Sequence, residues 1–530
     1  MKDRVLGRWR WPAALLLVLS STGCRERSTP CSTCDAVVVA AMGEPATLFP
    51  PFVEQTVGRD ISDLVFERLA DLAPSAAPID TAGYRPRLAS RWERLDSLTW
   101  RFHLRTGARW HDGQPMTAED VRFSFEAYGD STIGATGWPA GTGRIRVIVE
   151  DPSTFRVRFA EPSPEQLFDA TYRVRVIPKH VWAEIPTSRW RADSSLTHLV
   201  GSGPFRVREW RRGQHLILEA TPSNRSPVRR VIWRFTENAD AAVNLLLSHE
   251  ADLVETVGVP DRARVGADTS FRLAPYRGAV YGYVGFRLAD SMGRPHPVLG
   301  DRQLRRALAE AVNRPELATA LFGAGTRIPP GPMSQLLWIW DAGIRTLPFD
   351  TVSAARALRA RHGPGHRVRF DVLVPATSSI RRQAALALQE AWRRVGVEAT
   401  ITTVDFPIFQ ERLRQGKFDA YIGAYLDEPS PRGLAEQWSR AGWADLNYGH
   451  YGSPAFDSLL QAAQNDGDVA VAKRHWREAM DTLNADVPAI FLYAPSNVAA
   501  VHQRLAGFVV DPYSWLSGLQ ALRIDYRIPR

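Results

Sequence analysis

The stretch LTWRFHLRTGARWHDGQPMTAEDVRFSFEAY, residues 98–128, contains the signals of a strand, a turn and a helix in close succession. Trp100, Phe102 and Leu104 occupy every second position, which predicts a half-buried strand. Asp112-Gly113 is typical of a tight turn, because glycine readily adopts the backbone angles that such turns require. Apolar residues then recur at helical spacing. This succession predicts an α/β chain of the mixed α+β kind.

The same stretch also gathers side chains that could carry chemistry, namely His111, Asp112, Glu119 and Asp120. Thr117 precedes the predicted helix and Asp120 follows three residues later, which is the spacing of a capping box. Acids in a first helical turn also favour the helix dipole. We therefore predict a turn and a capped helix. The alternative is an exported enzyme that uses Asp112 and Glu119, and it requires these carboxyls to converge in a cleft with perturbed pKa values.

Length and composition favour a soluble protein of two or three domains. The chain has 530 residues, of which 45% are hydrophobic and 23% charged, and this length exceeds what one core usually holds. Its formal charge is +9, but the basic residues occur mostly singly or in pairs, and no run of five or more appears. Nucleic acid is therefore not an expected partner.

The N-terminus has the pattern of an export signal, residues 1–23. Basic residues precede the apolar run Ala13 to Leu19, which is too short to span a bilayer. The segment LSSTGC, ending at Cys24, resembles a bacterial lipobox, although serine stands at position 21, where leucine is preferred. The resemblance implies lipidation of Cys24, with ordinary signal cleavage as the alternative.

The other two cysteines, Cys31 and Cys34, lie in a Ser/Thr/Pro-rich tether. We expect them to form a small disulfide loop, because no thioredoxin-like unit surrounds them. A site of four cysteines for a metal is impossible with so few.

The C-terminal half has the pattern of parallel βαβ units. Residues 368–374 alternate as a strand, residues 380–395 carry apolar residues on one helical face, and a second strand pattern follows Gly396. A further unit consists of a short helix from Phe406 to Leu413 and the strand KFDAYIGAY. Such units place ligands at the carboxyl ends of their strands.

Common catalytic and cofactor motifs are missing from the sequence. It contains no H-E-x-x-H, no Walker A sequence and no G-x-G-x-x-G after a strand. His362 and His366 lie in a Gly/Pro-rich segment that does not favour the helix an i, i+4 metal pair needs. We expect no catalytic residue, no cofactor and no metal.

A longer segment, residues 88–128, resembles the signature region of bacterial extracellular solute-binding proteins of family 5, the oligopeptide, dipeptide and nickel binders of ABC importers. The resemblance continues in order over nearly the whole mature chain, in GEPATLFPPF (43–52), GSGPF (201–205), YVGFRL (283–288), DRQLRRALAEAVNR (301–314), LQEAWRRVGVEATI (388–401), NYGHYGSPAFDSLLQAA (447–463) and VPAIFLYAPSN (487–497).

The resemblance implies a two-lobed periplasmic-binding-protein clamshell with an extra domain inserted in lobe I. Hinge crossings are expected near Tyr276 and Ala489. The implied organisation is a signal peptide (1–23), a tether (24–35), lobe I (36–70, 191–275 and 489–530), the inserted domain (71–190) and lobe II (276–488).

The resemblance also implies ligand-binding residues in lobe II. In peptide-binding relatives, an aspartate in the loop after the strand matching FDAYIGAY pairs with the α-ammonium of the peptide. That aspartate corresponds to Asp427, with Glu428 as the near alternative. The other implied contacts are Gly423, Ala424, Tyr425, Trp438 and Tyr493, of which the aromatic residues could equally belong to the core. Ala424 stands where a tryptophan is frequent, and the loop of Asp427 is short, so peptide specificity is less firmly implied than the class.

The function implied is a substrate-binding receptor, monomeric and periplasmic or membrane-tethered, that delivers peptides to an ABC permease. Nickel chelates, opines and oligosaccharides are the alternative ligands. A sensory receptor of the same fold is a further alternative.

Overall fold

The computed structural model describes residues 35–74, 76–135, 145–363, 368–444, 446–520 and 522–528. The predicted export signal and the predictions for Cys24, Cys31 and Cys34 lie outside the described residues, as does His366. All that follows concerns the unit formed by Asp35–Arg530.

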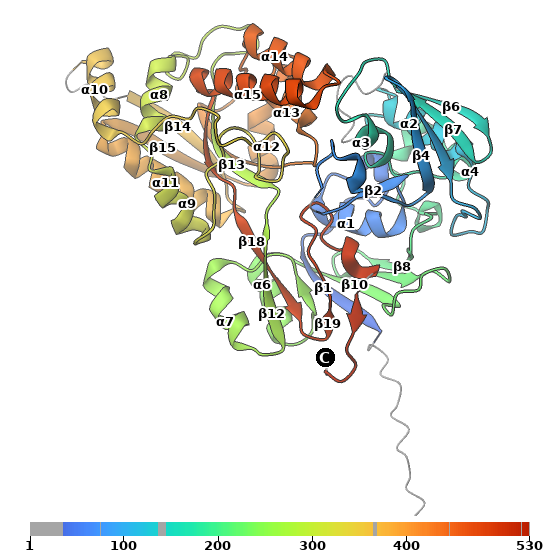
Figure 1. Ribbon diagram of the computed structural model, residues 1–530. Helices are drawn as coiled ribbons and strands as arrows, with labels where there is room; N and C mark the ends of the chain where they lie inside the picture. Colours follow the sequence, from blue (N-terminus) through green and yellow to red (C-terminus); the bar gives the residue numbers. More distant parts are fainter. Residues whose placement is uncertain are drawn as a thin grey trace, which may run out of the picture. The chain divides into compact units, whose positions relative to one another are not determined.

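Lobe I is the part of the described chain built around a seven-stranded sheet of order β12-β18-β11-β1-β10-β9-β8 (Figure 1). The strand β1 is parallel to β10 and β11, and the remaining pairs are antiparallel. The strands are β1 (Ala36–Met42), β8 (Phe205–Arg211), β9 (His215–Ala220), β10 (Arg230–Thr236), β11 (Leu253–Val254), β12 (Phe271–Arg277) and β18 (Ser496–His502).

The apolar run of β1 follows from its central position, since helices cover both faces of the sheet. Val37 and Val39 pack with the helix α1 (Thr56–Val65), whereas Val38 and Ala40 pack with α6 (Ala239–Leu247) and α7 (Arg262–Ala267). A strand buried on both faces is apolar throughout rather than alternating. A short pair, β19 (Leu505–Ala506) and β20 (Arg523–Ile524), completes the strands of this lobe.

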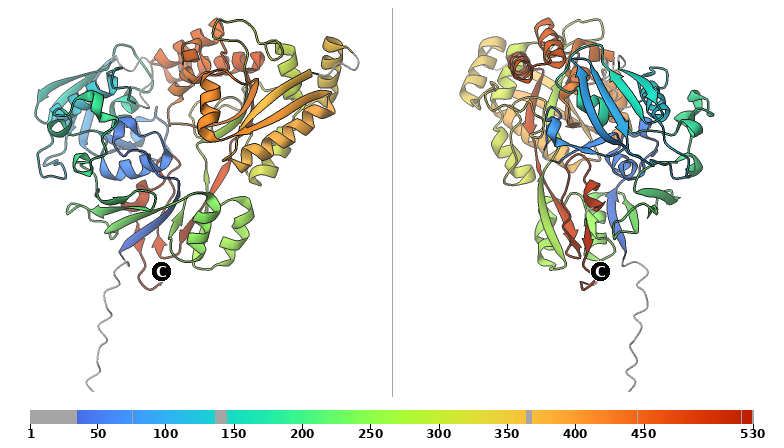
Figure 2. Two further views of the ribbon diagram at one scale, coloured as in Figure 1. Left: turned by 180° about the vertical axis from the view of Figure 1, so that it is seen from behind. Right: turned by 45° about the vertical axis from the view of Figure 1, so that its right-hand side comes forward.

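Lobe II is the part built around a five-stranded sheet of order β15-β14-β16-β13-β17. Its strands are β13 (Val280–Phe286), β14 (Val368–Pro375), β15 (Val397–Val404), β16 (Ala420–Leu426) and β17 (Ala489–Tyr493). The predicted βαβ unit is confirmed, because β14 and β15 are parallel, with Val368 opposite Val397, and the helix α11 (Ser379–Arg394) connects them. Figure 2 shows this sheet from behind, with α11 in orange.

The helices of lobe II pack on both faces of its sheet and form two apolar clusters. Besides α11 they are α8 (Arg302–Glu310), α9 (Arg314–Phe322), α10 (Thr351–His362), α12 (Phe406–Arg414), α13 (Leu434–Trp438), α14 (Pro454–Asn465) and α15 (Val469–Asp486).

The inserted region, β2 to α5, has its own four-stranded antiparallel sheet of order β4-β5-β7-β6 and its own core. The strands are β2 (Ala70–Leu72), β3 (Tyr84–Pro86), β4 (Ala89–Asp96), β5 (Thr99–Leu104), β6 (Arg146–Asp151) and β7 (Thr154–Arg158). The helices are α2 (Ala118–Gly129), α3 (Gln166–Thr171), α4 (Lys179–Trp182) and α5 (Thr187–Trp190).

The local predictions for residues 98–128 are confirmed. Trp100, Phe102 and Leu104 are buried on β5, and Gly113 has a positive φ of 89° in the predicted turn. At the start of α2 the carboxylate of Asp120 accepts a hydrogen bond from the backbone N–H of Thr117 at 2.9 Å. The capping-box geometry is present, so the acid has the structural role that its spacing predicted.

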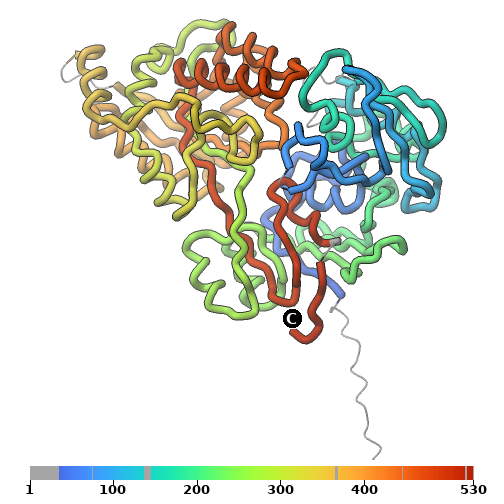
Figure 3. The backbone as a smooth tube through the Cα atoms, viewed as in Figure 1, coloured from blue at the N-terminus to red at the C-terminus, as the bar shows by residue number. Residues whose placement is uncertain are grey.

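Two neighbouring segments connect the lobes, between β12 and β13 and between β17 and β18 (Figure 3). The backbone N–H of Gly278 donates to the carbonyl of Pro495 at 3.1 Å, so the two segments touch at the crossing. The first crossing directly follows Arg277 and so lies near Tyr276, as expected, whereas the return crossing lies a few residues beyond Ala489. Tyr276 is still within β12, and β17 from Ala489 to Tyr493 pairs with β13 in the sheet of lobe II, so the return crossing follows Tyr493. The sequence of β17 is apolar throughout, which does not reveal the sheet it joins.

Candidate functional site

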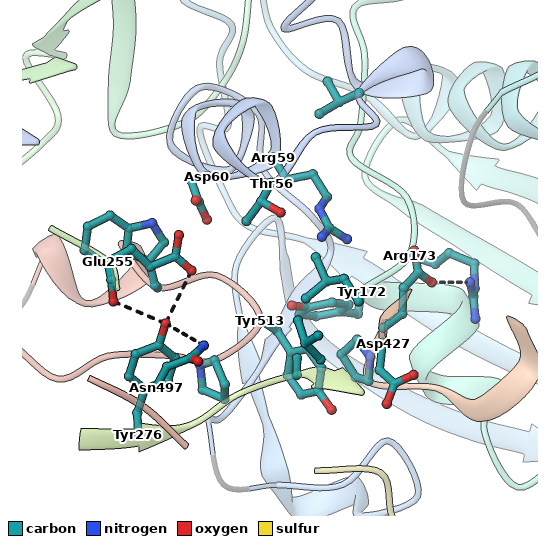
Figure 4. A pocket seen from close by; sticks show the side chains of 18 of the residues that line it. Thr56, Arg59, Asp60, Tyr172, Arg173, Glu255, Tyr276, Asp427, Asn497 and Tyr513 are labelled. Carbon is teal, nitrogen blue, oxygen red and sulfur yellow. Dashed lines mark hydrogen bonds and ion pairs between the residues drawn. The ribbon is translucent and has the colours of Figure 1, made fainter. Parts of the chain in front are cut away.

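A cavity of about 280 Å³ lies where lobe I, lobe II and the inserted region meet. Figure 4 shows its lining residues arriving from all three parts. Lobe I contributes Thr56, Arg59, Asp60, Arg68, Glu255, Tyr276, Asn497 and Tyr513, the inserted region contributes Tyr172, Arg173 and Arg175, and lobe II contributes Asp427 and Glu428.

A second, larger cavity of about 870 Å³ continues from the first along lobe II. Val53, Arg59, Leu426, Asp427 and Glu428 line both cavities. The larger cavity by itself falls within the usual range of small-molecule sites, about 300–1,000 Å³.

Asp427 follows β16 and is only 4% exposed. Its backbone N–H donates to the carbonyl of Ala279 at 2.7 Å, which fixes the loop beside the crossing segment. Its carboxylate accepts a hydrogen bond from the backbone N–H of Ser334. Among the described residues no basic side chain lies within ion-pair distance of it. Burial raises the pKa of Asp427 from 3.8 to about 7, although the Ser334 hydrogen bond lowers it.

This pKa predicts that stability falls as pH rises from about 4 to about 7. A carboxyl whose pKa is raised by folding stabilises the folded state only while it is protonated, so its contribution is present below the unfolded pKa and lost through the folded one. For a shift to about 7 the loss is at most about 4 kcal/mol. We expect Asp427→Asn to remove this pH-dependent contribution to stability. The measurement is the difference in free energy of unfolding between pH 5 and pH 8, in the wild type and in the variant. An equal pH dependence in both proteins would contradict the assignment.

Glu428 is engaged elsewhere. Its carboxylate accepts from the guanidinium of Arg173 at 3.1 Å, and Arg173 also donates to Asp169 at 3.0 Å. Because Glu428 already has a cation and is partly exposed, it is a weaker candidate for an ammonium contact than Asp427.

Two acids, Asp60 and Glu255, line the lobe I end of the smaller cavity (Figure 4). Burial, and then the charge of Glu255, raise the pKa of Asp60, and burial raises the pKa of Glu255. Glu255 accepts a hydrogen bond from the hydroxyl of Tyr276 at 3.4 Å, and Asn497 donates to that hydroxyl at 3.2 Å. This wall is polar and held by hydrogen bonds between residues of three different segments.

The remaining predicted contacts lie in different surroundings. Tyr425 lines the larger cavity. Gly423 lies against the ring of Tyr283, which a Cβ at this position would overlap, and Ala424 is the next residue of the same strand. Neither lines the two cavities.

Trp438 and Tyr493 are core residues of lobe II. Trp438 packs edge-on against Tyr283 and Phe491, and Tyr493 packs against Phe322 at a ring distance of 4.6 Å. Neither lines the two cavities, so the core interpretation of these aromatic residues fits the structure better.

The sequence did not predict most of the lobe I residues that line the smaller cavity. Arg59 and Asp60 lie on an amphipathic helix, whereas Glu255, Tyr276 and Asn497 come from three separate strand regions. One weak signal was available. Glu255 directly follows the short strand β11, and α/β folds place ligands at the carboxyl ends of their strands.

The acids of the enzyme hypothesis do not converge in this cleft. Asp112 pairs with His180 at 2.8 Å, and Glu119 pairs with Arg122 and Lys179, all at partly exposed positions of the inserted region. Neither acid lines the two cavities. Within the described ranges no group of three or more His, Cys, Asp or Glu side chains is placed to hold a metal ion.

The inserted region contacts lobe II through a set of polar side chains, most of them buried, which we call the interlobe polar cluster: Glu165, Asp169, Arg173, Glu428, Ser430 and Arg432. Glu165 is 2% exposed and accepts from the hydroxyl of Ser430 at 2.6 Å. Arg432 lies 3.5 Å from Glu165 and 3.4 Å from Asp169. Trp338 of lobe II donates to the other oxygen of Glu165 at 2.7 Å.

The profile of one protein family, the bacterial extracellular solute-binding proteins, family 5 (middle region), matches residues 83–445. The oligopeptide-binding protein AppA of Bacillus subtilis is 22% identical over 498 residues, which cover 90% of this chain and 89% of that protein. The dipeptide-binding protein of Escherichia coli is 24% identical over 511 residues, which cover 90% of this chain and 92% of that protein.

Solved structures share the fold. AppA from Bacillus subtilis in complex with a nonapeptide superposes with a TM-score of 0.78 at 19% identity, over 92% of this chain and 99% of that one. NikZ from Campylobacter jejuni in complex with Ni(L-His) superposes with a TM-score of 0.79 at 20% identity, over the same shares of the two chains, 92% and 99%. In the part of the chain that the structure describes, no helix has the length and apolar character needed to cross a membrane.

Proposed function

Because this chain belongs to the bacterial extracellular solute-binding proteins of family 5, we propose that it is the substrate-binding receptor of an ABC importer. It binds oligo- or dipeptides in the cleft between the lobes and delivers them unchanged to a membrane permease. It acts as a monomer in the periplasm or on the outer face of the cell membrane, anchored through a lipid on Cys24.

The observation that carries this proposal is the buried carboxyl of Asp427, a residue that lines the cavity and has no ion-pair partner in the described chain. An enclosed charge needs a partner, and the α-ammonium of a peptide supplies one through a charge-assisted hydrogen bond. Peptide binding by AppA and the peptide-binding names of the relatives support the same ligand class.

The mechanism is closure about the two crossing segments. A ligand that touches both lobes favours the closed form by as much as it binds that form more tightly than the open one. The cavity meets this requirement, because its lining comes from lobe I, lobe II and the inserted region. No bond of the ligand needs to be made or broken.

The test is a screen of the purified protein by thermal shift and native mass spectrometry against di- to pentapeptides, nickel chelates, opines and oligosaccharides. Ligands that bind only the folded state raise the apparent melting temperature. We expect peptides to raise it and to appear as a one-to-one complex. A response to nickel–histidine or to a sugar, with none to peptides, would transfer the function to that ligand class.

A further inference from the structure

The strand β1 begins at the end of the lobe I sheet that lies opposite the candidate cavity. It runs parallel to β11, with Ala40 opposite Val254. Glu255 directly follows β11 and lines the smaller cavity. Because parallel strands share their direction, the carboxyl ends of both strands lie toward the cavity. The amino end of β1, at Ala36, therefore lies at the far end of the sheet.

Three segments that are distant in sequence lie together at this end. The backbone N–H of Arg229 donates to the carbonyl of Asp35 at 2.8 Å. The guanidinium of Arg504 donates to the carbonyl of Ala36 at 2.7 Å, and the carbonyl of Arg504 accepts from the backbone N–H of Asp525 at 2.8 Å. Figures 1 and 2 show the start of β1, in blue, beside the red hairpin of β19 and β20. We call this surface the anchor face, and it consists of Asp35, residues 225–230 and residues 523–528.

The anchor face carries an excess of positive charge. Its two acids are both paired, Asp35 with Arg230 at 3.3 Å and Asp525 with Arg527 at 2.7 Å. Its other charged side chains are exposed arginines without an acidic partner in the described chain: Arg225, Arg229 and Arg523. Five arginines and two aspartates give the face a formal charge of +3. An anionic surface is therefore its electrostatic complement.

The proposed lipid on Cys24 would hold this same face close to a bilayer. Ten residues separate Cys24 from Asp35 in the sequence, and a chain of that length spans at most about 40 Å. A surface held so near meets the bilayer at a high effective concentration. The face also presents Tyr526, which is 62% exposed. Tyrosine is favoured at the boundary between lipid headgroups and water, because its ring is apolar and its hydroxyl polar.

We propose that the anchor face docks on the anionic headgroups of the cell membrane. This assignment rests on the lipid anchor of the proposed function and adds an orientation to it. Because the cavity lies at the opposite end of the sheet, a docked receptor presents the cavity away from the bilayer. Docking therefore favours the capture of solute, and the receptor leaves the surface in order to turn its cleft toward a permease.

The experiment measures partition of the mature chain into lipid vesicles by flotation. The chain carries Cys24→Ser, so that no lipid is attached and only the folded protein binds. The vesicles are phosphatidylcholine alone, or phosphatidylcholine and phosphatidylglycerol in a ratio of about two to one. At low salt, phosphatidylglycerol should raise the partition coefficient roughly hundredfold, as for three arginines close to an anionic bilayer. High salt should remove this difference, because it screens exposed charges.

Two triple variants locate the binding surface. The anchor-face variant, in which Arg225, Arg229 and Arg523 are replaced by Gln, should bind both kinds of vesicle equally weakly. The lobe II variant loses the same net charge through replacement by Gln of three exposed arginines of α10 and α11, and it should keep the wild-type preference: Arg356, Arg359 and Arg382.

Three results would overturn the assignment: equal partition of the wild type into both kinds of vesicle, an unchanged preference in the anchor-face variant, or an equal loss in the lobe II variant. If the anchor-face variant does not fold, each of its three substitutions made singly should lower the preference roughly fivefold. The anchor-face variant should keep the wild-type affinity for peptides, because its substitutions lie opposite the cavity. Failure of every peptide in the earlier screen would reject the proposed function and leave the vesicle result unaffected.

Discussion

Asp427→Ala is expected to weaken peptide binding by about 2–5 kcal/mol, the usual cost of removing one partner from an enclosed charge pair. Asp427 is 4% exposed and lines the cavity directly after the end of β16. In the closed form the peptide ammonium would lose its hydration, and the neighbouring acid Glu428 is already paired with Arg173. Titration calorimetry at pH 8, where Asp427 is ionised, measures the difference in affinity.

The control for this prediction is the ligand itself. An N-acetylated peptide lacks the ammonium, so it should bind the wild type and Asp427→Ala with similar, weak affinity. The affinity of the wild type for a free peptide should also fall between pH 8 and pH 5, because a cation favours the ionised form of a carboxyl whose pKa is about 7. An unchanged affinity of Asp427→Ala would move the ammonium contact to Glu428 or to another acid.

The parts of the fold that could be predicted from the sequence depend on local patterns. The strand at Thr99–Leu104, the cap of α2 by Asp120 and the β14–α11–β15 unit each follow from residues within a few turns of one another. The assignment of β17 to lobe II depends instead on its pairing with β13, about two hundred residues earlier. An apolar strand carries no signal for such a distant partner.

The residues of the candidate site also differ in how far the sequence could predict them. Asp427 could be named because the family resemblance implies an aspartate in the loop after this strand, and in the structure it is among the residues that line the cavity, while its contact with a ligand stays a prediction. The cavity position of Arg59 could not be predicted, since an arginine on an amphipathic helix has the same local pattern whether it faces solvent or a cleft. The aromatic residues were ambiguous for a related reason, because Trp438 and Tyr493 are apolar enough to line a ligand cavity or to belong to the core. In the structure Trp438 packs against Phe491 and Tyr493 against Phe322, which places both in the core.

Arg432→Met is expected to weaken ligand binding by about 3–5 kcal/mol, although Arg432 is not assigned any contact with the ligand. Arg432 lies within ion-pair distance of Glu165 and Asp169, which are 2% and 1% exposed. Methionine keeps much of the volume but leaves Glu165 without its cation. Burial already raises the pKa of Glu165, so the loss of Arg432 makes the carboxylate costlier still to enclose.

The weaker binding expected for Arg432→Met can be distinguished from an ordinary loss of folding stability, because the affected side chains come from different lobes. Glu165 and Asp169 belong to the inserted region and Arg432 to lobe II, so opening of the lobes would separate Arg432 from both acids. The penalty should therefore oppose closure and leave the melting temperature of the ligand-free protein nearly unchanged. Small-angle scattering with saturating peptide should show a smaller compaction than in the wild type. Arg393→Met removes an exposed pair with Glu390 in lobe II, and it should change neither quantity, because such surface pairs contribute little. An equal fall in ligand-free stability and in affinity would instead assign the interlobe polar cluster to folding rather than to closure.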